Sequence, residues 1–313
     1  MRPKSLMMLS AYIGVIGTVC ILLGSCRNSG VEAIPVANAP DGAASASSAQ
    51  NPYQGKPMAR FDLTKLRRFS DDTTLTPQER LAGLLGCWRE AMETPTPPAL
   101  GPGGGPIDSG YVQGVIVGVM GQTVAPKDLS RARAEETNPV LQDHLAVALG
   151  LAGDKSVTSQ LIEILKREPN GALRQNVAIG LADFKESSVK PTLYAMLDDN
   201  YSRIMISGVG GGGISKIYPV REAAARGLRL LGEQVSPDLY TDARRASDVT
   251  EAIAWLLEDK DPQVCQSAVT LLGQQGEAGA PYLKAFVEQN VSDPTLQAAL
   301  EAAQALISEA DSR

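Results

Sequence analysis

The chain has 313 residues, enough for one large domain or for an elongated repeat array with a tail. Hydrophobic residues make up 43% but aromatic residues only 4%, so the core must be mostly aliphatic side chains and alanine, which favours closely packed helices. The formal net charge of -6 and the absence of a basic stripe argue against a protein that binds nucleic acid.

Few side chains are available for catalysis or metal binding. Catalytic triads and histidine-based zinc or iron sites need imidazole, and His144 is the single histidine of the chain. It lies in a helical pattern, and we expect it on a helix surface or in a groove. The four cysteines form no Cys-x-x-Cys pair. We therefore expect no metal, no other cofactor and no catalytic activity.

The first residues predict export and lipid attachment. Arg2 and Lys4 precede an apolar run over residues 6–23, which is the pattern of a signal peptide. The segment Leu23-Gly24-Ser25-Cys26 resembles the lipobox of bacterial lipoproteins. The resemblance implies that residues 1–25 are removed and that Cys26 becomes a lipidated N-terminus. An uncleaved membrane anchor is the alternative, because the apolar run is close to the length of a spanning helix.

The segment after the lipobox is predicted to be a tether. Residues 26–59 are rich in Ala, Ser, Pro and Gly and have almost nothing to bury, so we expect them to be disordered. Arg27 follows the cysteine where an aspartate would favour retention at the inner membrane. The expected location is therefore the cell envelope, lipid-anchored, at the outer membrane facing the periplasm if the cell is Gram-negative.

Residues 60–137 are predicted to form an N-terminal helical region. The capping box Thr76-Pro77-Gln78-Glu79 opens a helix over residues 76–93. Residues 94–110 are rich in proline and glycine and must form a loop. The following stretch, 112–121, is either a degenerate first repeat or, because of its valines, a strand.

Residues 138–308 carry an internal repeat of helix pairs. Each of four segments places an aliphatic residue eight positions before a leucine, namely Leu141/Leu149, Leu173/Leu181, Val220/Leu228 and Val264/Leu272. Small residues lie between them, so that a neighbouring helix can approach closely. The pairs Asn138-Pro139 and Asp261-Pro262 are typical of a helix start. Leu141 and Leu173 are 32 residues apart (173 − 141).

Helix pairs that recur at this period are typical of an α-solenoid. The segments resemble HEAT-like repeats of a short bacterial type, whose pattern is roughly Asp-Pro-x-Val-Arg-x-Ala-Ala-x-x-Leu-Gly. Cys265 stands where that pattern has arginine. The resemblance implies an all-α protein, a right-handed α-solenoid of HEAT-like helix pairs with a possible small β-hairpin insert.

The period is interrupted by inserts near 200–217 and 232–247. The first contains Gly208, Gly210 and Gly213, a literal match to the Gly-x-Gly-x-x-Gly pattern of dinucleotide loops. The next helix is predicted near Pro219 rather than on the glycines, so we expect no nucleotide. The insert is either a plain mobile loop or a protruding β-hairpin. In the second case, the side chains expected to contact a partner are Ile204, Met205, Ile206, Ile214, Ile217 and Tyr218.

Together these patterns predict a membrane-anchored envelope lipoprotein that acts as a protein-binding or scaffolding HEAT-repeat module. The alternative is an accessory or activating subunit of an envelope enzyme or transport complex. The expected partner is an unidentified envelope protein, with the membrane reached through the lipid anchor and with no nucleic acid or nucleotide bound. Cys87 and Cys265 are expected to be buried thiols, with a disulfide as the alternative.

Overall fold

The computed structural model describes residues 61–94, 98–100, 106–206, 213–242, 244–259, 261–290 and 294–311. The chain divides into two units, Met1–Ala59 and Arg60–Arg313, and every described residue belongs to the second. The expected signal peptide over 1–25, the lipidated Cys26 and the tether over 26–59 lie outside the described residues. Within the described segments, no helix combines the length and apolar character needed to cross a bilayer.

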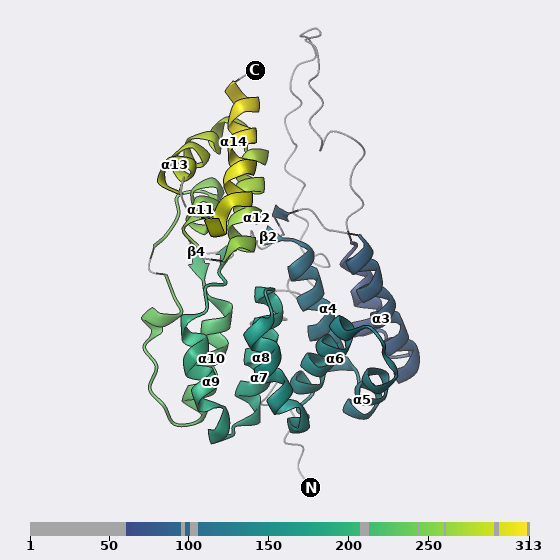
Figure 1. Cartoon of the computed structure of the whole chain (residues 1–313). Helices are drawn as coiled ribbons and strands as arrows, with labels where there is room; N and C mark the ends of the chain where they lie inside the picture. The colour runs from purple at the N-terminus through teal and green to yellow at the C-terminus, as the bar shows by residue number, and fades with distance from the viewer. Residues whose placement is uncertain are drawn as a thin grey trace, which may run out of the picture. The chain divides into compact units, whose positions relative to one another are not determined.

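The described chain is an array of helices with two small β-hairpins (Figure 1), which confirms the predicted all-α fold with a small hairpin. The helices are α2 (Thr64–Asp71), α3 (Pro77–Glu93), α4 (Ser109–Thr123), α5 (Pro126–Glu135), α6 (Pro139–Leu151), α7 (Thr158–Arg167), α8 (Gly171–Phe184), α9 (Lys190–Ala195), α10 (Pro219–Leu230), α11 (Val249–Trp255), α12 (Pro262–Gln274), α13 (Ala280–Asn290) and α14 (Gln297–Asp311). The hairpins pair β1 (Ala99–Leu100) with β2 (Pro106–Ile107) and β3 (Arg203–Ile206) with β4 (Ile214–Ile217).

Helices begin where the sequence places a cap. The side-chain oxygens of Asn138, Asn170 and Asp261 each accept hydrogen bonds from the backbone amides two and three residues ahead, at 2.9–3.4 Å. These bonds satisfy amides that have no partner within the helix. The predicted capping box of α3 is also confirmed, because Thr76 and Glu79 exchange side chain-to-backbone hydrogen bonds of 3.2 and 2.8 Å.

The predicted seam of the repeat is buried. The eight aliphatic seam residues are at most 6% exposed, and the alanines between them are at most 7% exposed. Helix α6 packs on α8, and α8 packs on α10, so the first helices of successive repeats lie side by side (Figure 1). The small residues let these helices approach closely, as the spacing predicts.

The close contact between α8 and α10 gives a prediction about two glycines. A Cβ atom added at Gly227 of α10 would lie 2.7 Å from the Cβ of Ala182 and 2.9 Å from its Cα. We expect Gly227→Ala to lower the free energy of unfolding by about 1–3 kcal/mol through overpacking. The matched control is Gly86→Ala in α3, where no described atom apart from the adjacent residues and the helix's own backbone lies within 4 Å of the added Cβ. It should stabilise the protein by about 0.5–1 kcal/mol. Urea unfolding measures both, and effects of the same sign would contradict the prediction.

The valine-rich stretch 112–121 lies within helix α4, so the strand alternative is wrong. The carboxylate of Asp108 caps the helix by accepting from the backbone amide of Tyr111 at 2.8 Å. Helix α4 packs against α3, α6 and α8, and this contact buries Val112, Ile116 and Met120 completely or nearly so. Burial on several sides therefore outweighs the preference of β-branched residues for strands.

The two inserts pair with each other. Strands β3 and β4 match the arms of the predicted hairpin, whereas its turn, 207–212, lies outside the described residues. Strand β4 also forms bridges to the second insert, Ile214 with Ala246 and Ile217 with Thr241. The backbone amide of Ala246 donates to the carbonyl of Ile214 at 3.1 Å. The hairpin alternative is thus confirmed in its arms, and the next helix, α10, begins at Pro219 as predicted.

A buried ion pair fixes the hairpin to α11. Lys216 of β4 is 2% exposed, and its Nζ lies 3.2 Å from the Oδ2 of Asp259 and donates to the carbonyl of Trp255 at 2.9 Å. The hydroxyl of Ser202 donates to the same carboxylate. Burial raises the pKa of Asp259, and the interactions with Lys216 and Ser202 oppose that rise. The hairpin is thereby part of the packed C-terminal group of helices.

The two described cysteines, Cys87 and Cys265, are buried and free, as expected. The Sγ of Cys265 donates to the carbonyl of Asp259 at 2.9 Å. Burial raises the pKa of the Cys265 thiol to about 12, so it stays protonated and unreactive at neutral pH.

Candidate binding cleft

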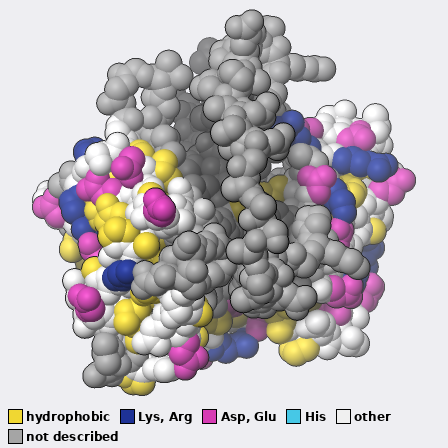
Figure 2. All heavy atoms as spheres, turned by 90° about the horizontal axis from the view of Figure 1, so that it is seen from above, with side chains coloured by type: hydrophobic (Ala, Val, Ile, Leu, Met, Phe, Trp, Pro, Cys, Tyr) yellow, Lys and Arg dark blue, Asp and Glu magenta, His cyan; other side chains and the backbone are white. Residues whose placement is uncertain are grey.

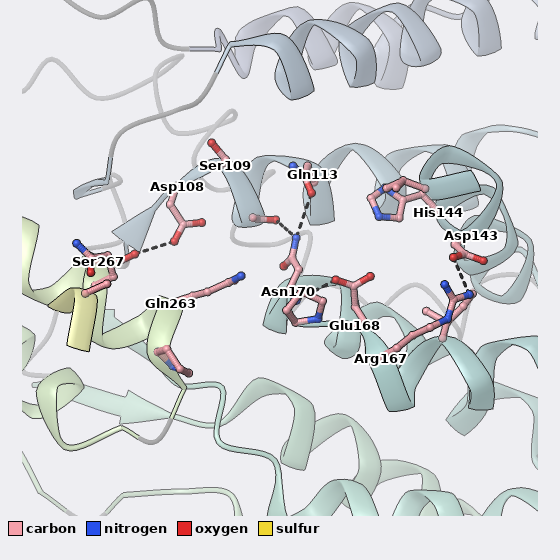
Figure 3. A pocket seen from close by; sticks show the side chains of 17 residues that line it. Asp108, Ser109, Gln113, Asp143, His144, Arg167, Glu168, Asn170, Gln263 and Ser267 are labelled. Carbon is pink, nitrogen blue, oxygen red and sulfur yellow. Dashed lines mark hydrogen bonds and ion pairs between the residues drawn. The ribbon is translucent and has the colours of Figure 1, made fainter. Parts of the chain in front are cut away.

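A cavity of about 810 Å³ lies among five parts of the array. Its wall is formed by the first turn of α4, by α6, by the end of α7 with the turn to α8, by the first turns of α12 and by the start of α14 (Figure 3). We call this cavity the cleft. Apolar side chains of Val140, Ile164 and Pro262 line it together with carboxylates, amides and hydroxyls. It therefore offers both apolar contact and hydrogen bonds to a bound molecule.

His144 stands in the wall of the cleft with its tautomer fixed. Its Nδ1 accepts a hydrogen bond of 2.7 Å from the indole N–H of Trp88, and the two rings meet edge to face at 5.4 Å. The ring therefore carries its proton on Nε2. His144 is only 2% exposed, so the expectation of a helix-surface position is wrong and the groove position is right. Burial lowers the pKa of His144 to about 4, with Asp143 opposing the change.

The lowered pKa of His144 predicts a pH dependence of stability. The unfolded chain takes up a proton near pH 6.5 and the folded chain only near pH 4, so stability is lost as the pH falls through this window. The loss is expected to reach about 3 kcal/mol at pH 4. Urea unfolding of the wild type and His144→Leu at several pH values measures it. Because the variant removes the single histidine, the stability of the wild type relative to the variant should fall by about 3 kcal/mol between pH 7 and pH 4. A difference that does not change with pH would contradict the prediction.

Three carboxylates face the cleft and one guanidinium accompanies them. Arg167 is paired with Asp143 at 2.7 Å. The carboxylate of Glu168 accepts a hydrogen bond of 2.9 Å from the backbone N–H of Asn170. Burial raises the pKa of the Glu168 carboxyl. Asp108 accepts from the hydroxyl of Ser267 at 3.0 Å. Across the described residues, no group of three or more His, Cys, Asp or Glu side chains is arranged to hold a metal ion.

Asn170 and Asn176 of the α8 region fix α4 beside the cleft. The amide nitrogen of Asn170 donates to the carbonyl of Gly110 at 3.0 Å and reaches the side chain of Gln113 at 3.4 Å. The amide nitrogen of Asn176 donates to the carbonyl of Gly114 at 2.8 Å. These contacts hold α4 on α8 by its backbone, so the wall is formed by a rigid element.

Arg174 connects the N-terminal repeats to α12. Its guanidinium lies 2.7 Å from Asp199, which follows α9, and 2.9 Å from Asp261, which caps α12. It also donates to the carbonyl of Pro169 in the turn that lines the cleft. The same side chain therefore positions two opposite parts of the cleft wall.

Five of the six side chains predicted to contact a partner are described, and all five lie outside the lining of the cleft. Met205 is 44% exposed, whereas Ile204 is buried in the C-terminal core. Ile214, Ile217 and Tyr218 are partly buried, and the guanidinium of Arg221 lies 4.2 Å from the ring of Tyr218. Ile206 is in β3, and its side chain is not described. A partner contact at this hairpin stays a prediction, as does lipidation of Cys26.

Comparison with known proteins gives a repeat family. The model of HEAT repeats matches residues 127–207. A solved structure of human deoxyhypusine hydroxylase in complex with glycerol is 14% identical, with a TM-score of 0.24, and the match covers 79% of this chain and 96% of that chain. No curated protein matches the sequence.

The expectation of no catalytic activity needs a correction. One solved structure that matches is that of an enzyme, and the expectation of no catalytic activity is therefore withdrawn. At a TM-score of 0.24 and 14% identity, the match supports no specific reaction, substrate or residue for this chain.

Proposed function

We propose that this chain, a HEAT-like repeat protein, is held at a membrane of the cell envelope by a lipid on Cys26. In this proposal it binds a segment of a partner protein in the cleft. HEAT repeats suggest a protein-interaction or scaffold module, because stacked helix pairs present long surfaces. The lipobox-like Leu23-Gly24-Ser25-Cys26 supports the anchor.

The observation that supports protein binding most directly is the composition of the cleft. Apolar side chains, three carboxylates and several amides come from five separate parts of the array and face one space. On the face seen in Figure 2, charged side chains of both signs alternate with hydrophobic ones among the described residues. We therefore expect a partner to be selected by individual contacts in the cleft more than by the overall electrostatic potential of the surface.

The anchor is tested by metabolic labelling with a fatty acid. The wild type should incorporate label, and Cys26→Ala should not. Cys20→Ala is the matched control, because Cys20 lies in the apolar run and fits the lipobox less well. Absence of label in the wild type would overturn lipidation and leave the apolar run as a plain anchor.

The cleft is tested by photo-crosslinking in cells. The residue p-benzoylphenylalanine replaces Gln263, an exposed residue in the wall of the cleft, and separately replaces Gln289, an exposed residue of α13 outside the wall. The expected result is a discrete crosslinked protein band with Gln263 that is absent with Gln289. Equal crosslinking at both positions, or none at Gln263, would overturn the cleft as the binding surface.

A further inference from the structure

The geometry of the cleft points to its occupant, and we propose that it takes an extended peptide segment of the partner that carries a lysine or an arginine. This inference rests on the proposed function and names the kind of partner segment for the same cleft. It has two supports, an available donor and acceptor for a peptide backbone, and a charge balance that favours a cation.

The first support is a pair of hydrogen-bonding groups that have no partner among the described residues. Because Trp88 occupies Nδ1 of His144, the Nε2–H group of that buried ring is a donor for a bound molecule. The side-chain oxygen of Gln266 is buried and has no hydrogen-bond partner within the described part of the chain. A buried polar group without a partner costs free energy, so a ligand that satisfies it gains affinity.

These two groups come from different walls of the cleft. His144 belongs to α6, and Gln266 belongs to α12, whose neighbouring residues Gln263 and Ser267 lie at the far side of the cleft from His144 in Figure 3. An extended peptide offers carbonyl acceptors and N–H donors in alternation along its length, so one backbone can satisfy both groups.

The second support is the charge of the wall. Asp108, Asp143 and Glu168 face the cleft, and Arg167, the single guanidinium in the described wall, is already paired with Asp143. Glu168 makes no ion pair within 4.0 Å in the described structure, and its side chain lies between the two ends of the cleft in Figure 3. A positive side chain beside Glu168 would stabilise this half-buried carboxylate.

The same balance argues against anionic occupants. A phosphate or an acidic peptide would add negative charge to a wall that holds three carboxylates and one paired guanidinium. His144 is neutral at physiological pH, because its pKa is lowered to about 4, and does not reverse this balance. Unpaired like charges in a partly buried site are costly, so a cationic segment is the occupant that fits.

The test uses the full-length protein in detergent and three fluorescein-labelled eight-residue peptides. Alanine alternates with lysine in the first, with glutamine in the second and with glutamate in the third. Fluorescence anisotropy should give saturable binding of the lysine peptide, with an affinity about tenfold or more above that of the glutamine peptide. The glutamate peptide should not bind. Equal affinity for the lysine and glutamine peptides would overturn the preference for a cation.

Two variants locate the contacts. Glu168→Gln should weaken binding of the lysine peptide about five- to tenfold and leave the glutamine peptide unchanged. Gln266→Leu should weaken both peptides by a similar factor, because it removes a backbone contact. The matched control is Glu163→Gln, on the exposed face of α7, which should change nothing. An unchanged affinity in Glu168→Gln, with a thermal melting curve like that of the wild type, would overturn the placement.

The outcomes separate this inference from the function on which it rests. If no peptide binds but Gln263 still crosslinks to a protein, the cationic segment is wrong and the cleft remains a protein-binding surface. If neither occurs, the proposed function fails with it. If free spermine competes as strongly as the lysine peptide, and Gln266→Leu has no effect, the occupant is a small cation and the peptide is ruled out.

Discussion

Replacing Arg174 with methionine is expected to lower the free energy of unfolding by about 3–5 kcal/mol, because it leaves two largely buried carboxylates, Asp199 and Asp261, without their cation. Asp261 also caps α12, and its second oxygen is the one that Arg174 binds. Loss of the arginine should therefore displace the start of α12 and with it the wall of the cleft. Urea unfolding measures the loss of stability, and crosslinking from Gln263 measures the displacement.

The control for Arg174→Met is Arg89→Met. Arg89 pairs with Glu136 at 3.0 Å, but its side chain is 54% exposed. An exposed pair of this kind contributes about 0–1 kcal/mol, so this variant should be close to the wild type in stability. Similar losses in the two variants would show that burial of the ion pair is not the cause. An unchanged crosslinking yield in Arg174→Met would show that α12 keeps its place without it.

Replacing Lys216 with methionine is expected to lower the free energy of unfolding by about 3–5 kcal/mol. The variant leaves the carboxylate of Asp259, whose side chain is 2% exposed, with the hydroxyl of Ser202 as its one side-chain partner among the described residues. The double variant Lys216→Met/Asp259→Leu removes both charges and should recover most of the loss. The reason is that a buried pair gains little over apolar side chains of similar size. Burial raises the pKa of Asp259, as expected for a carboxylate whose burial costs more than its partners return.

The control for the hairpin pair is Lys190→Met, because Lys190 and Glu233 form a partly exposed pair. It should cost no more than about 1 kcal/mol. Thermal or urea unfolding measures the stability of four proteins: the wild type, Lys216→Met, the double variant and the control Lys190→Met. The double variant could instead be as unstable as Lys216→Met alone. In that case the uncompensated charge of Asp259 is not the cause of the loss, and the hairpin needs the Lys216 and Asp259 side chains themselves for its packing.

The helices could be predicted because their signals are local. Asn138 and Asp261 lie two and three residues from the amides that they cap, and the seam spacing is a property of one helix at a time. The hairpin arms could also be predicted, since the apolar runs flank a glycine cluster within 15 residues (217 − 203 + 1). The helix α4 could not be decided from its valines, because neighbouring helices determine its conformation.

The cleft could not be predicted, because each contact that builds it joins residues far apart in the chain. Trp88 and His144 are separated by 56 positions, Arg174 and Asp261 by 87, and Asp108 and Ser267 by 159. No sequence spacing encodes these distances. The single available signal was the lone histidine, and its helical context did not reveal that Trp88 would bind it.

The bridges between β4 and the second insert have a consequence for any attempt to edit this protein. Excision of residues 203–217 would strip Ala246 and Thr241 of their strand partners and would leave the carboxylate of Asp259 without Lys216. Unpaired strand edges of this kind recruit other chains. The two interruptions of the repeat thus form one structural unit, to be kept, exchanged or transplanted together.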